Sequence, residues 1–450
     1  MSINFRGSDG IDLGDKFISK DYLISVYPNI SNQLITPELW VWGNNSFGQL
    51  GENTTINRST PVTTLSGGAN WKQVSCGANH VSAIKTDGTL WTWGYNIGGQ
   101  LGDNTTTDRS TPVTTFAGGT NWKQVSAGNL HTLAIKTDGT LWTWGSNAYG
   151  QLGDNTSTNR STPVTTFAGG TNWKQVACGQ IHTAAIKTDG TLWTWGRNLS
   201  GQVGDNTTTS RFTPVTTFAG GTNWKQVSAG SLHTLAIKTD GTLWTWGRNN
   251  SGQLGDNAAT DRSTPVTTFA GGNNWKQVAF SANGYHTAAI KTDGTLWTWG
   301  RNLSGQLGDN AATDRSTPVT TFAGGTNWKQ VACGQEHTAA IKTDGTLWTW
   351  GYNIGGQVGD NTTTQRFTPV TTFAGGTNWK QVFAGVNDTV AIKTDGTLWT
   401  WGRNSSGQLG DNTTTNRSTP VTTFAGGNNW KQVASGYSHT AATTYIDDYQ

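Results

Sequence analysis

One short sequence recurs along the whole chain and constrains its fold more than any other feature. The motif Leu-Trp-x-Trp-Gly begins at eight positions: Leu39, Leu90, Leu141, Leu192, Leu243, Leu296, Leu347 and Leu398. Successive copies start 51 residues apart, except that 53 residues separate Leu243 from Leu296, where FSANGYH (280–286) is longer than its counterparts. A fixed period of about 50 residues is the signature of a repeat architecture, in which each unit buries its apolar face against its neighbours.

Each repeat is predicted to fold as four short antiparallel strands. The first two are NWKQVA and HTAAIK, and TDGT then turns the chain, since Asp-Gly is a strong hairpin signal. The third strand, LWTWG, alternates its side chains between two faces. A loop rich in Gly, Asn and Thr leads to the fourth, TPVTTF, whose proline suits the edge of a sheet. Four strands repeated eight times predict an all-β protein, an eight-bladed β-propeller.

The repeat CGxxHTxAIKTDGTLWTWGxNxxGQLG resembles that of the regulator of chromosome condensation family, a set of β-propellers. The resemblance runs from Leu39 to Ile446 and therefore covers most of the chain. It implies a propeller that binds proteins, although the family's namesake has seven blades and this chain has eight repeats. The family's chromatin binding depends on a basic arm and its nucleotide exchange on a wedge-like insertion. Neither has a counterpart here.

The two ends of the chain are predicted to build one blade together. Seven blades can be assembled from contiguous sequence, the first from Trp71 to Phe116 and the last from Trp379 to Phe424. The segments 39–65 and 429–445 remain, and each supplies two strands. We expect them to pair as the eighth blade, which closes the ring and removes the exposed edges of an open array.

Composition excludes several classes of protein. The formal net charge is +3 and charged residues make up 13% of the chain, which gives no electrostatic reason to expect binding to nucleic acid or an anionic membrane. The 3 cysteines argue against a disulfide framework. No apolar run approaches the roughly 18 residues that span a bilayer, and the N-terminus lacks the regions of a secretory signal. We expect a soluble protein with no membrane insertion.

The most conspicuous side chains occupy equivalent places in every repeat, which favours structural roles. The 24 tryptophans fill three places per repeat and are predicted to pack blade against blade. One further place holds His in seven repeats and Asp388 in the eighth: His80, His131, His182, His233, His286, His337 and His439. Ligands spread around a wide ring do not converge on one metal ion. The resemblance implies instead that each imidazole bonds backbone groups of a neighbouring turn.

The remaining repeated polar residues also have structural interpretations. Eight arginines, each six residues after an Asp or Glu, are predicted to form ion pairs that pin the long loop: Arg58, Arg109, Arg160, Arg211, Arg262, Arg315, Arg366 and Arg417. Cys76, Cys178 and Cys333 share one repeat position and are interpreted as small buried residues, neither bridged nor catalytic. An active site needs different groups in defined roles, and no such set stands apart from the repeat. We predict no catalytic residue, no metal and no cofactor, and hence no enzyme.

Differences between the repeats are concentrated in two stretches. One follows each Trp-Gly, and the other lies between a Gly and the repeated His. Strand direction places both on one face of the propeller, opposite the Asp-Gly turns, and we interpret this varied face as a recognition surface. Its candidate contacts are Tyr95, Ile97, Tyr149, Arg197, Leu199, Arg248, Tyr285, Arg301, Leu303, Tyr352, Ile354, Arg403 and Tyr437. Neutral drift of exposed loops is the alternative explanation.

Residues 1–38 precede the propeller (39–446) and differ from it in kind, and a tail of residues 447–450 follows it. The arm lacks repeat character but contains apolar residues, and 20–27 is a candidate helix. We predict that it docks on a protein partner in a larger assembly through Phe17, Ile18, Tyr22, Leu23, Ile24 and Tyr27.

Three functions fit these observations. The first is a non-enzymatic display module in a phage virion, tail- or capsid-associated, that presents the varied face to a receptor or a glycan. The second is a protein-interaction scaffold or GTPase regulator of the chromosome-condensation-regulator type, in the cytoplasm. The third is a multivalent lectin. None of the three involves nucleic acid.

Overall fold

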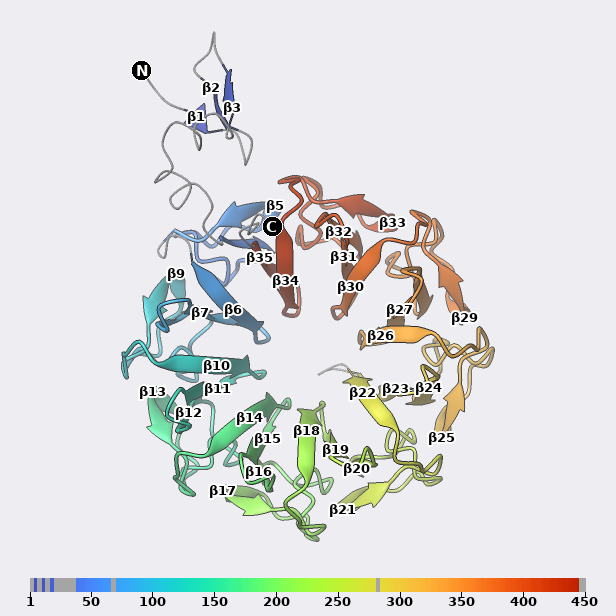
Figure 1. Cartoon of the computed structure of the whole chain (residues 1–450). Helices are drawn as coiled ribbons and strands as arrows, with labels where there is room; N and C mark the ends of the chain where they lie inside the picture. Colours follow the sequence, from blue (N-terminus) through green and yellow to red (C-terminus); the bar gives the residue numbers. More distant parts are fainter. Residues whose placement is uncertain are drawn as a thin grey trace.

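The computed structural model describes residues 4–5, 10–12, 17–19, 38–65, 70–280 and 284–444. Eight four-stranded antiparallel sheets form a ring around a central opening (Figure 1). A further three-stranded sheet consists of β1 (Asn4–Phe5), β2 (Gly10–Asp12) and β3 (Phe17–Ser19). The predicted eight-bladed all-β propeller is confirmed. Within the described residues, no helix is long and apolar enough to cross a membrane.

The strands repeat with the period of the sequence. The first strand of each blade lies nearest the central opening (Figure 1), and these strands are β6 (Trp71–Cys76), β10 (Trp122–Ala127), β14 (Trp173–Cys178), β18 (Trp224–Ala229), β22 (Trp275–Phe280), β26 (Trp328–Cys333), β30 (Trp379–Ala384) and β34 (Trp430–Ser435). The second strands are β7 (His80–Lys85), β11 (His131–Lys136), β15 (His182–Lys187), β19 (His233–Lys238), β23 (His286–Lys291), β27 (His337–Lys342), β31 (Asp388–Lys393) and β35 (His439–Thr444).

The other two strands of each blade lie farther from the centre. The third strands are β8 (Leu90–Gly94), β12 (Leu141–Gly145), β16 (Leu192–Gly196), β20 (Leu243–Gly247), β24 (Leu296–Gly300), β28 (Leu347–Gly351), β32 (Leu398–Gly402) and β4 (Leu39–Gly43). The fourth strands form the outer rim (Figure 1) and are β9 (Arg109–Thr114), β13 (Arg160–Thr165), β17 (Arg211–Thr216), β21 (Arg262–Thr267), β25 (Arg315–Thr320), β29 (Arg366–Thr371), β33 (Arg417–Thr422) and β5 (Arg58–Thr63).

The ends of the propeller sequence meet in one blade. Its strand order is β34-β35-β4-β5, so two C-terminal strands continue directly into two N-terminal strands. His439 pairs with Gly43, and Ala441 pairs with Val41. The predicted closure is confirmed, and it leaves no blade with an open edge toward a missing neighbour.

The hydrophobic core is divided among the blade interfaces. In one interface, Ile84 and Leu90 from one blade pack with Trp122, Val125 and Trp144 from the next. The Trp122 ring lies edge-on to the Trp144 ring at a centroid distance of 6.2 Å. The buried Trp144 indole donates a hydrogen bond to the Gln100 carbonyl of the preceding blade at 2.9 Å. These contacts confirm that the tryptophans pack blade against blade.

The hairpins give the disc two chemically different faces. On the Asp-Gly face, the turn between the second and third strands meets the link into the next blade, where the Trp122 amide donates to the Gly88 carbonyl at 3.0 Å. Gly88 has a φ of 80°, and a Cβ there would lie 2.1 Å from the Thr120 carbonyl oxygen, so only glycine fits. On the opposite, varied face, the Tyr95 amide donates to the Asn79 carbonyl at 2.9 Å. The two varied stretches therefore lie side by side, as predicted.

Candidate partner-binding surface

Five of the predicted contacts lie on four adjacent blades of the varied face, where they make contacts between blades. The Arg197 guanidinium lies over the Tyr149 ring of the preceding blade, 5.3 Å from its centroid. The Arg248 guanidinium lies over the Tyr285 ring of the following blade, also at 5.3 Å. Arg301 forms an ion pair with Glu336 of the blade after its own, at 3.4 Å. We call Tyr149, Arg197, Arg248, Tyr285 and Arg301 the arginine arc.

The arginine arc combines positive charge with accessible apolar surface. Arg197, Arg248 and Arg301 follow the third strands of three consecutive blades, and all three side chains are half-exposed. Leu199 and Leu303, each 59% exposed, flank it on the same face. The Nε of Arg197 is buried and has no hydrogen-bond partner among the described residues. Guanidinium groups held over aromatic rings and flanked by leucines can bind an acidic, partly apolar partner.

The other predicted contacts on this face are not part of the arc. Tyr95 packs edge-on against Phe47 of the neighbouring blade at 4.7 Å. Phe47 is not among the contacts predicted from the sequence, although it occupies the same repeat position as Tyr149. Ile97 and Ile354 are 67% and 61% exposed, whereas Tyr352 is half-buried. Arg403 is exposed and donates to Ser405 at 3.1 Å.

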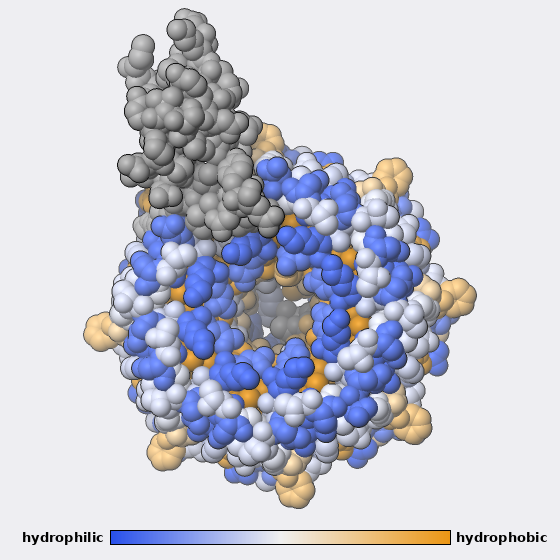
Figure 2. Space-filling view, viewed as in Figure 1, coloured by the Kyte–Doolittle hydropathy of each residue, from blue (hydrophilic) through white to orange (hydrophobic). Residues whose placement is uncertain are grey.

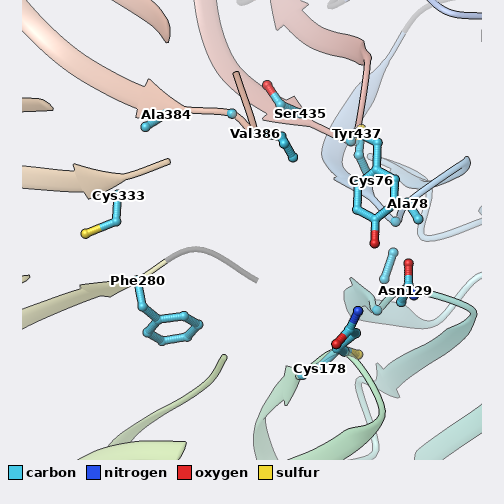
Figure 3. A pocket seen from close by; sticks show the side chains of 17 residues that line it. Cys76, Ala78, Asn129, Cys178, Phe280, Cys333, Ala384, Val386, Ser435 and Tyr437 are labelled. Atoms are coloured by element: carbon cyan, nitrogen blue, oxygen red, sulfur yellow. The ribbon is translucent and has the colours of Figure 1, made fainter. Parts of the chain in front are cut away.

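Tyr437 lies apart from the other predicted contacts, at the central opening. It extends from its blade toward Asn129 (Figure 3) and hydrogen-bonds the Gln180 side chain, which also accepts from Ser231 at 2.9 Å. Tyr437, Asn129 and Gln180 line a cavity of about 180 Å³ into which Phe280 also projects. The sequence predicted Tyr437 only as a contact on the varied face, and its position at the central opening follows from the structure. Ala78 and Val386, which like Tyr437, Asn129 and Gln180 directly follow the Gly of their links, line the same cavity.

The repeated histidines form a polar ring between blades. The Nε2 of His80 lies 3.0 Å from the Thr132 hydroxyl of the next blade. That hydroxyl donates its one proton to the Gln100 carbonyl at 2.9 Å, so it must accept from Nε2–H, and the imidazole is the neutral Nε2-protonated tautomer. Burial, reinforced by the neighbouring imidazoles His131 and His439, lowers the pKa of His80 to about 3. Five of the seven histidines (His80, His131, His182, His286 and His337) therefore contact a threonine hydroxyl of the next blade rather than the backbone groups implied by the resemblance. The ring nitrogens of His233 and His439 have no hydrogen-bond partner among the described residues.

The seven repeated histidines and Asp388 do not converge on a metal site in the described part of the chain. Within residues 38–65, 70–280 and 284–444, no group of three His, Cys, Asp or Glu side chains could hold a metal ion. Cys76, Cys178 and Cys333 are unbridged and all three line the central cavity, where Cys333 is buried and the other two are partly buried. Burial raises the pKa of the Cys178 thiol to about 12, so it is not a thiolate nucleophile at neutral pH. Its Sγ donates to the Ser126 carbonyl of the preceding blade at 3.3 Å.

The predicted loop ion pairs are present in all eight repeats. In one of them, Arg109 Nε lies 2.6 Å from a carboxylate oxygen of Asp103. The same loop is also held by Asn96, whose side-chain amide donates to Asp103 and to the Thr105 carbonyl at 3.1 Å. These pairs are structural, because both partners come from one loop.

The buried Asp388 carboxyl is expected to lower the free energy of unfolding as the pH rises. Burial raises the pKa of this carboxyl from 3.8 to about 7, so the folded protein retains a proton that the unfolded chain loses. The stabilising contribution is present below about pH 4 and is lost as the pH rises through about 7. Asp388→Asn should therefore gain on the order of 4 kcal/mol in free energy of unfolding, relative to the parent, between about pH 4 and pH 8.

Urea unfolding of both proteins at the two pH values measures this difference. The buried histidines titrate equally in both proteins and cancel in the comparison. Asp395→Asn, at an exposed turn, is the matched control and should show no such gain. A pH-independent difference for Asp388→Asn would contradict the assignment.

The predicted arm contacts are only partly described. Phe17 and Ile18 lie in β3, which pairs with β2 through Ile18 and Ile11. Tyr22, Leu23, Ile24, Tyr27 and the candidate helix 20–27 lie outside the described residues.

Comparison with known proteins identifies the family. A model of the RCC1-like domain matches residues 29–268 and 213–446. The chain belongs to the RCC1-like family. The ultraviolet-B receptor UVR8 of Arabidopsis thaliana is 34% identical over 355 residues, which are 77% of this chain and 80% of that protein.

Two further relatives extend the comparison. The X-linked retinitis pigmentosa GTPase regulator homologue of Caenorhabditis elegans is 29% identical over 337 residues, 64% of this chain but only 24% of that protein. The crystal structure of yeast RCC1 bound to Kap60 shares the fold of this RCC1-like chain, with a TM-score of 0.64, 18% identity, and coverage of 100% of this chain and 95% of that one.

The predicted virion location is wrong. The RCC1-like relatives named above come from a plant, a nematode and yeast, and none of their names describes a phage particle. The misleading signal was composition, since near-identical repeats rich in Thr, Asn and Gly reflect the demands of the RCC1-like blade. The comparisons also give no support to a phage origin for residues 1–38. The cytoplasmic alternative stays a prediction.

Proposed function

We propose that this RCC1-like chain is a non-enzymatic protein-binding propeller whose partner docks on the varied face through the arginine arc. The observation that carries the proposal is the clustering of the repeat-to-repeat differences. Three consecutive blades present arginine at one position, and two of the three stack it on tyrosine from a neighbouring blade. Arg and Tyr are the residues that most often anchor protein interfaces, because each combines a large contact area with a polar group.

The charge of the arc indicates the chemistry of the partner. Among the described residues, Arg301 is the one arginine of the arc that forms an ion pair, with Glu336, so Arg197 and Arg248 present guanidinium groups available to carboxylates of a partner. Leu199 and Leu303 supply apolar contact beside them. A partner segment with acidic residues around an apolar anchor fits this surface. The related yeast RCC1 was crystallised with a protein, Kap60, which supports protein binding as the general role.

A triple substitution on the arc tests the proposal. The partner is isolated on the immobilised full chain, and its affinity for purified variants is measured by calorimetry. Arg197→Ala, Arg248→Ala and Arg301→Ala together are expected to weaken binding by about 100-fold or more. Lys72→Ala, Lys123→Ala and Lys174→Ala remove the same charge from the opposite face and should leave the affinity unchanged. Equal losses in both triple variants would show that only net charge matters and would overturn the assignment.

Regulation of a small GTPase is the second candidate, favoured by the nematode GTPase regulator homologue. Release of labelled nucleotide from purified small GTPases should accelerate when the chain is added, and the arc variants should lose this effect. Unchanged release across the panel would leave binding without regulation. Attachment through residues 1–38, a receptor or glycan on the varied face, and lectin activity stay predictions.

A further inference from the structure

The Asp-Gly face carries an excess of positive charge that the overall charge of +3 conceals. In every blade the second residue of the first strand is an exposed lysine, and these residues are Lys72, Lys123, Lys174, Lys225, Lys276, Lys329, Lys380 and Lys431. A complete repeat adds one half-buried lysine, such as Lys85 over two indoles, and one turn aspartate, such as Asp87. In each of the seven complete repeats, lysines on this face therefore outnumber aspartates by one.

A β-bulge directs each of the eight lysines outward. The pairing register of β6 shifts between Trp71 and Gln73, so Lys72 has no partner on β7. Trp71 packs into the blade interface, and the Gln73 side chain donates to the Val125 carbonyl of the next blade at 3.0 Å. The residue between them is left to face solvent. In the described part of the chain, none of the ion pairs involves any of these eight lysines.

An apolar ring surrounds this lysine ring at the rim of the disc. One side chain after each fourth strand is 62% to 69% exposed, and these residues are Leu65, Phe116, Phe167, Phe218, Phe269, Phe322, Phe373 and Phe424. They lie toward the Asp-Gly face, because Thr114 at the end of β9 pairs with Trp91, next to the turn. In Figure 2, apolar side chains project at intervals from the rim, outside a hydrophilic surface.

We propose that the Asp-Gly face binds flat to the surface of a bilayer that contains anionic lipids. Eight equivalent lysines on a ring lie at one level of the disc, so all of them can meet a planar array of anionic headgroups at once. Each lysine near such a surface adds a modest attraction, and their sum gives stable binding. The rim phenylalanines reach the interfacial layer around the same contact, where aromatic side chains are favoured.

Two other polyanionic partners fit the face less well. A protein interface is usually anchored by aromatic residues at its centre and depleted of lysine, whereas the exposed large apolar residues of the described chain lie at the rim or toward the varied face. A nucleic-acid duplex is a rod, and it would contact only the lysines beneath one strip of the disc. It would also leave the apolar rim without a role. The planar bilayer is the partner that uses both rings.

Flotation with liposomes tests the proposal on the full chain. The protein should float with vesicles of phosphatidylcholine and phosphatidylserine, remain behind with phosphatidylcholine alone, and be released as salt is raised. Combined Lys72→Gln, Lys123→Gln, Lys174→Gln and Lys225→Gln should lower the partition coefficient by on the order of 100-fold. These side chains are exposed and unpaired, and near-ultraviolet circular dichroism checks that the fold is retained.

Two control variants separate the rings from net charge. Arg197→Gln, Arg248→Gln, Arg301→Gln and Arg403→Gln remove the same charge from the varied face and should bind vesicles as the parent does. Phe116→Ser, Phe167→Ser and Phe218→Ser should weaken binding by about 10-fold while keeping its salt dependence. Equal binding to neutral vesicles, equal loss in the arginine variant, or binding to a DNA duplex in place of anionic vesicles would each overturn the proposal.

Discussion

Replacing Trp144 with alanine is expected to lower the free energy of unfolding by about 3–5 kcal/mol. The Trp144 ring is fully buried between two blades, and the surrounding β-sheets cannot collapse far into the space it leaves. The substitution also leaves the Gln100 carbonyl without its indole donor, although the Thr132 hydroxyl still donates to it. Urea denaturation followed by circular dichroism measures the loss.

The matched control is the tryptophan two residues earlier in the same strand. Trp142 is only partly buried, its ring contacts the Lys136 ammonium at 4.8 Å, and its indole donates to the partly exposed Thr140 hydroxyl. Trp142→Ala should therefore cost less than half as much as Trp144→Ala. Equal costs at the two positions would mean that cation–π and rim contacts, rather than burial between blades, hold the propeller together.

Removing residues 429–450 is expected to abolish the cooperative fold rather than to delete one strand pair. The truncation takes away β34 and β35, which leaves β4 with no partner on one side and exposes Leu39 and Val41, because their core neighbour Ala441 is removed. The two neighbouring blades lose an interface each, and the open edge of β4 becomes a template for association between chains. Size-exclusion chromatography should show aggregates in place of a monomer, and thermal melting should lose its single transition.

A shorter truncation controls for loss of length. Removing residues 446–450 keeps β35, which ends at Thr444, and should leave the melting temperature and the monomer unchanged. Restoration of folding by adding residues 429–445 as a separate peptide would further support closure by strand pairing. A cooperative monomer in the absence of residues 429–450 would show that seven blades suffice.

The sequence predicted the fold well because every blade repeats the same local signals. The Asp-Gly turn, the Leu-Trp-Thr-Trp alternation and the strand proline recur along the chain. The same assignment of strands and turns can therefore be checked in one repeat against the others. The leftover halves 39–65 and 429–445 predicted closure for the same reason. The candidate surface was predicted only as a face. Strand direction placed Arg197 and Arg248 on that face, but it could not indicate that they stack on Tyr149 and Tyr285 of neighbouring blades.

The sequence alone determined the period, the four strands of each unit and the way the ends meet. The strands follow from local backbone preferences, and the period and the closure follow from counting the strands in each repeat. The tertiary structure decided what the repeated polar residues do. His80 bonds Thr132, which is 52 residues away and in the next blade, and no local pattern encodes that contact. The tertiary structure also determined how the charge is distributed between the two faces of the disc. A net charge of +3 predicted no electrostatic surface, yet β-hairpin geometry gathers an exposed lysine from every blade on one side of the disc, because equivalent residues in a ring always share a face.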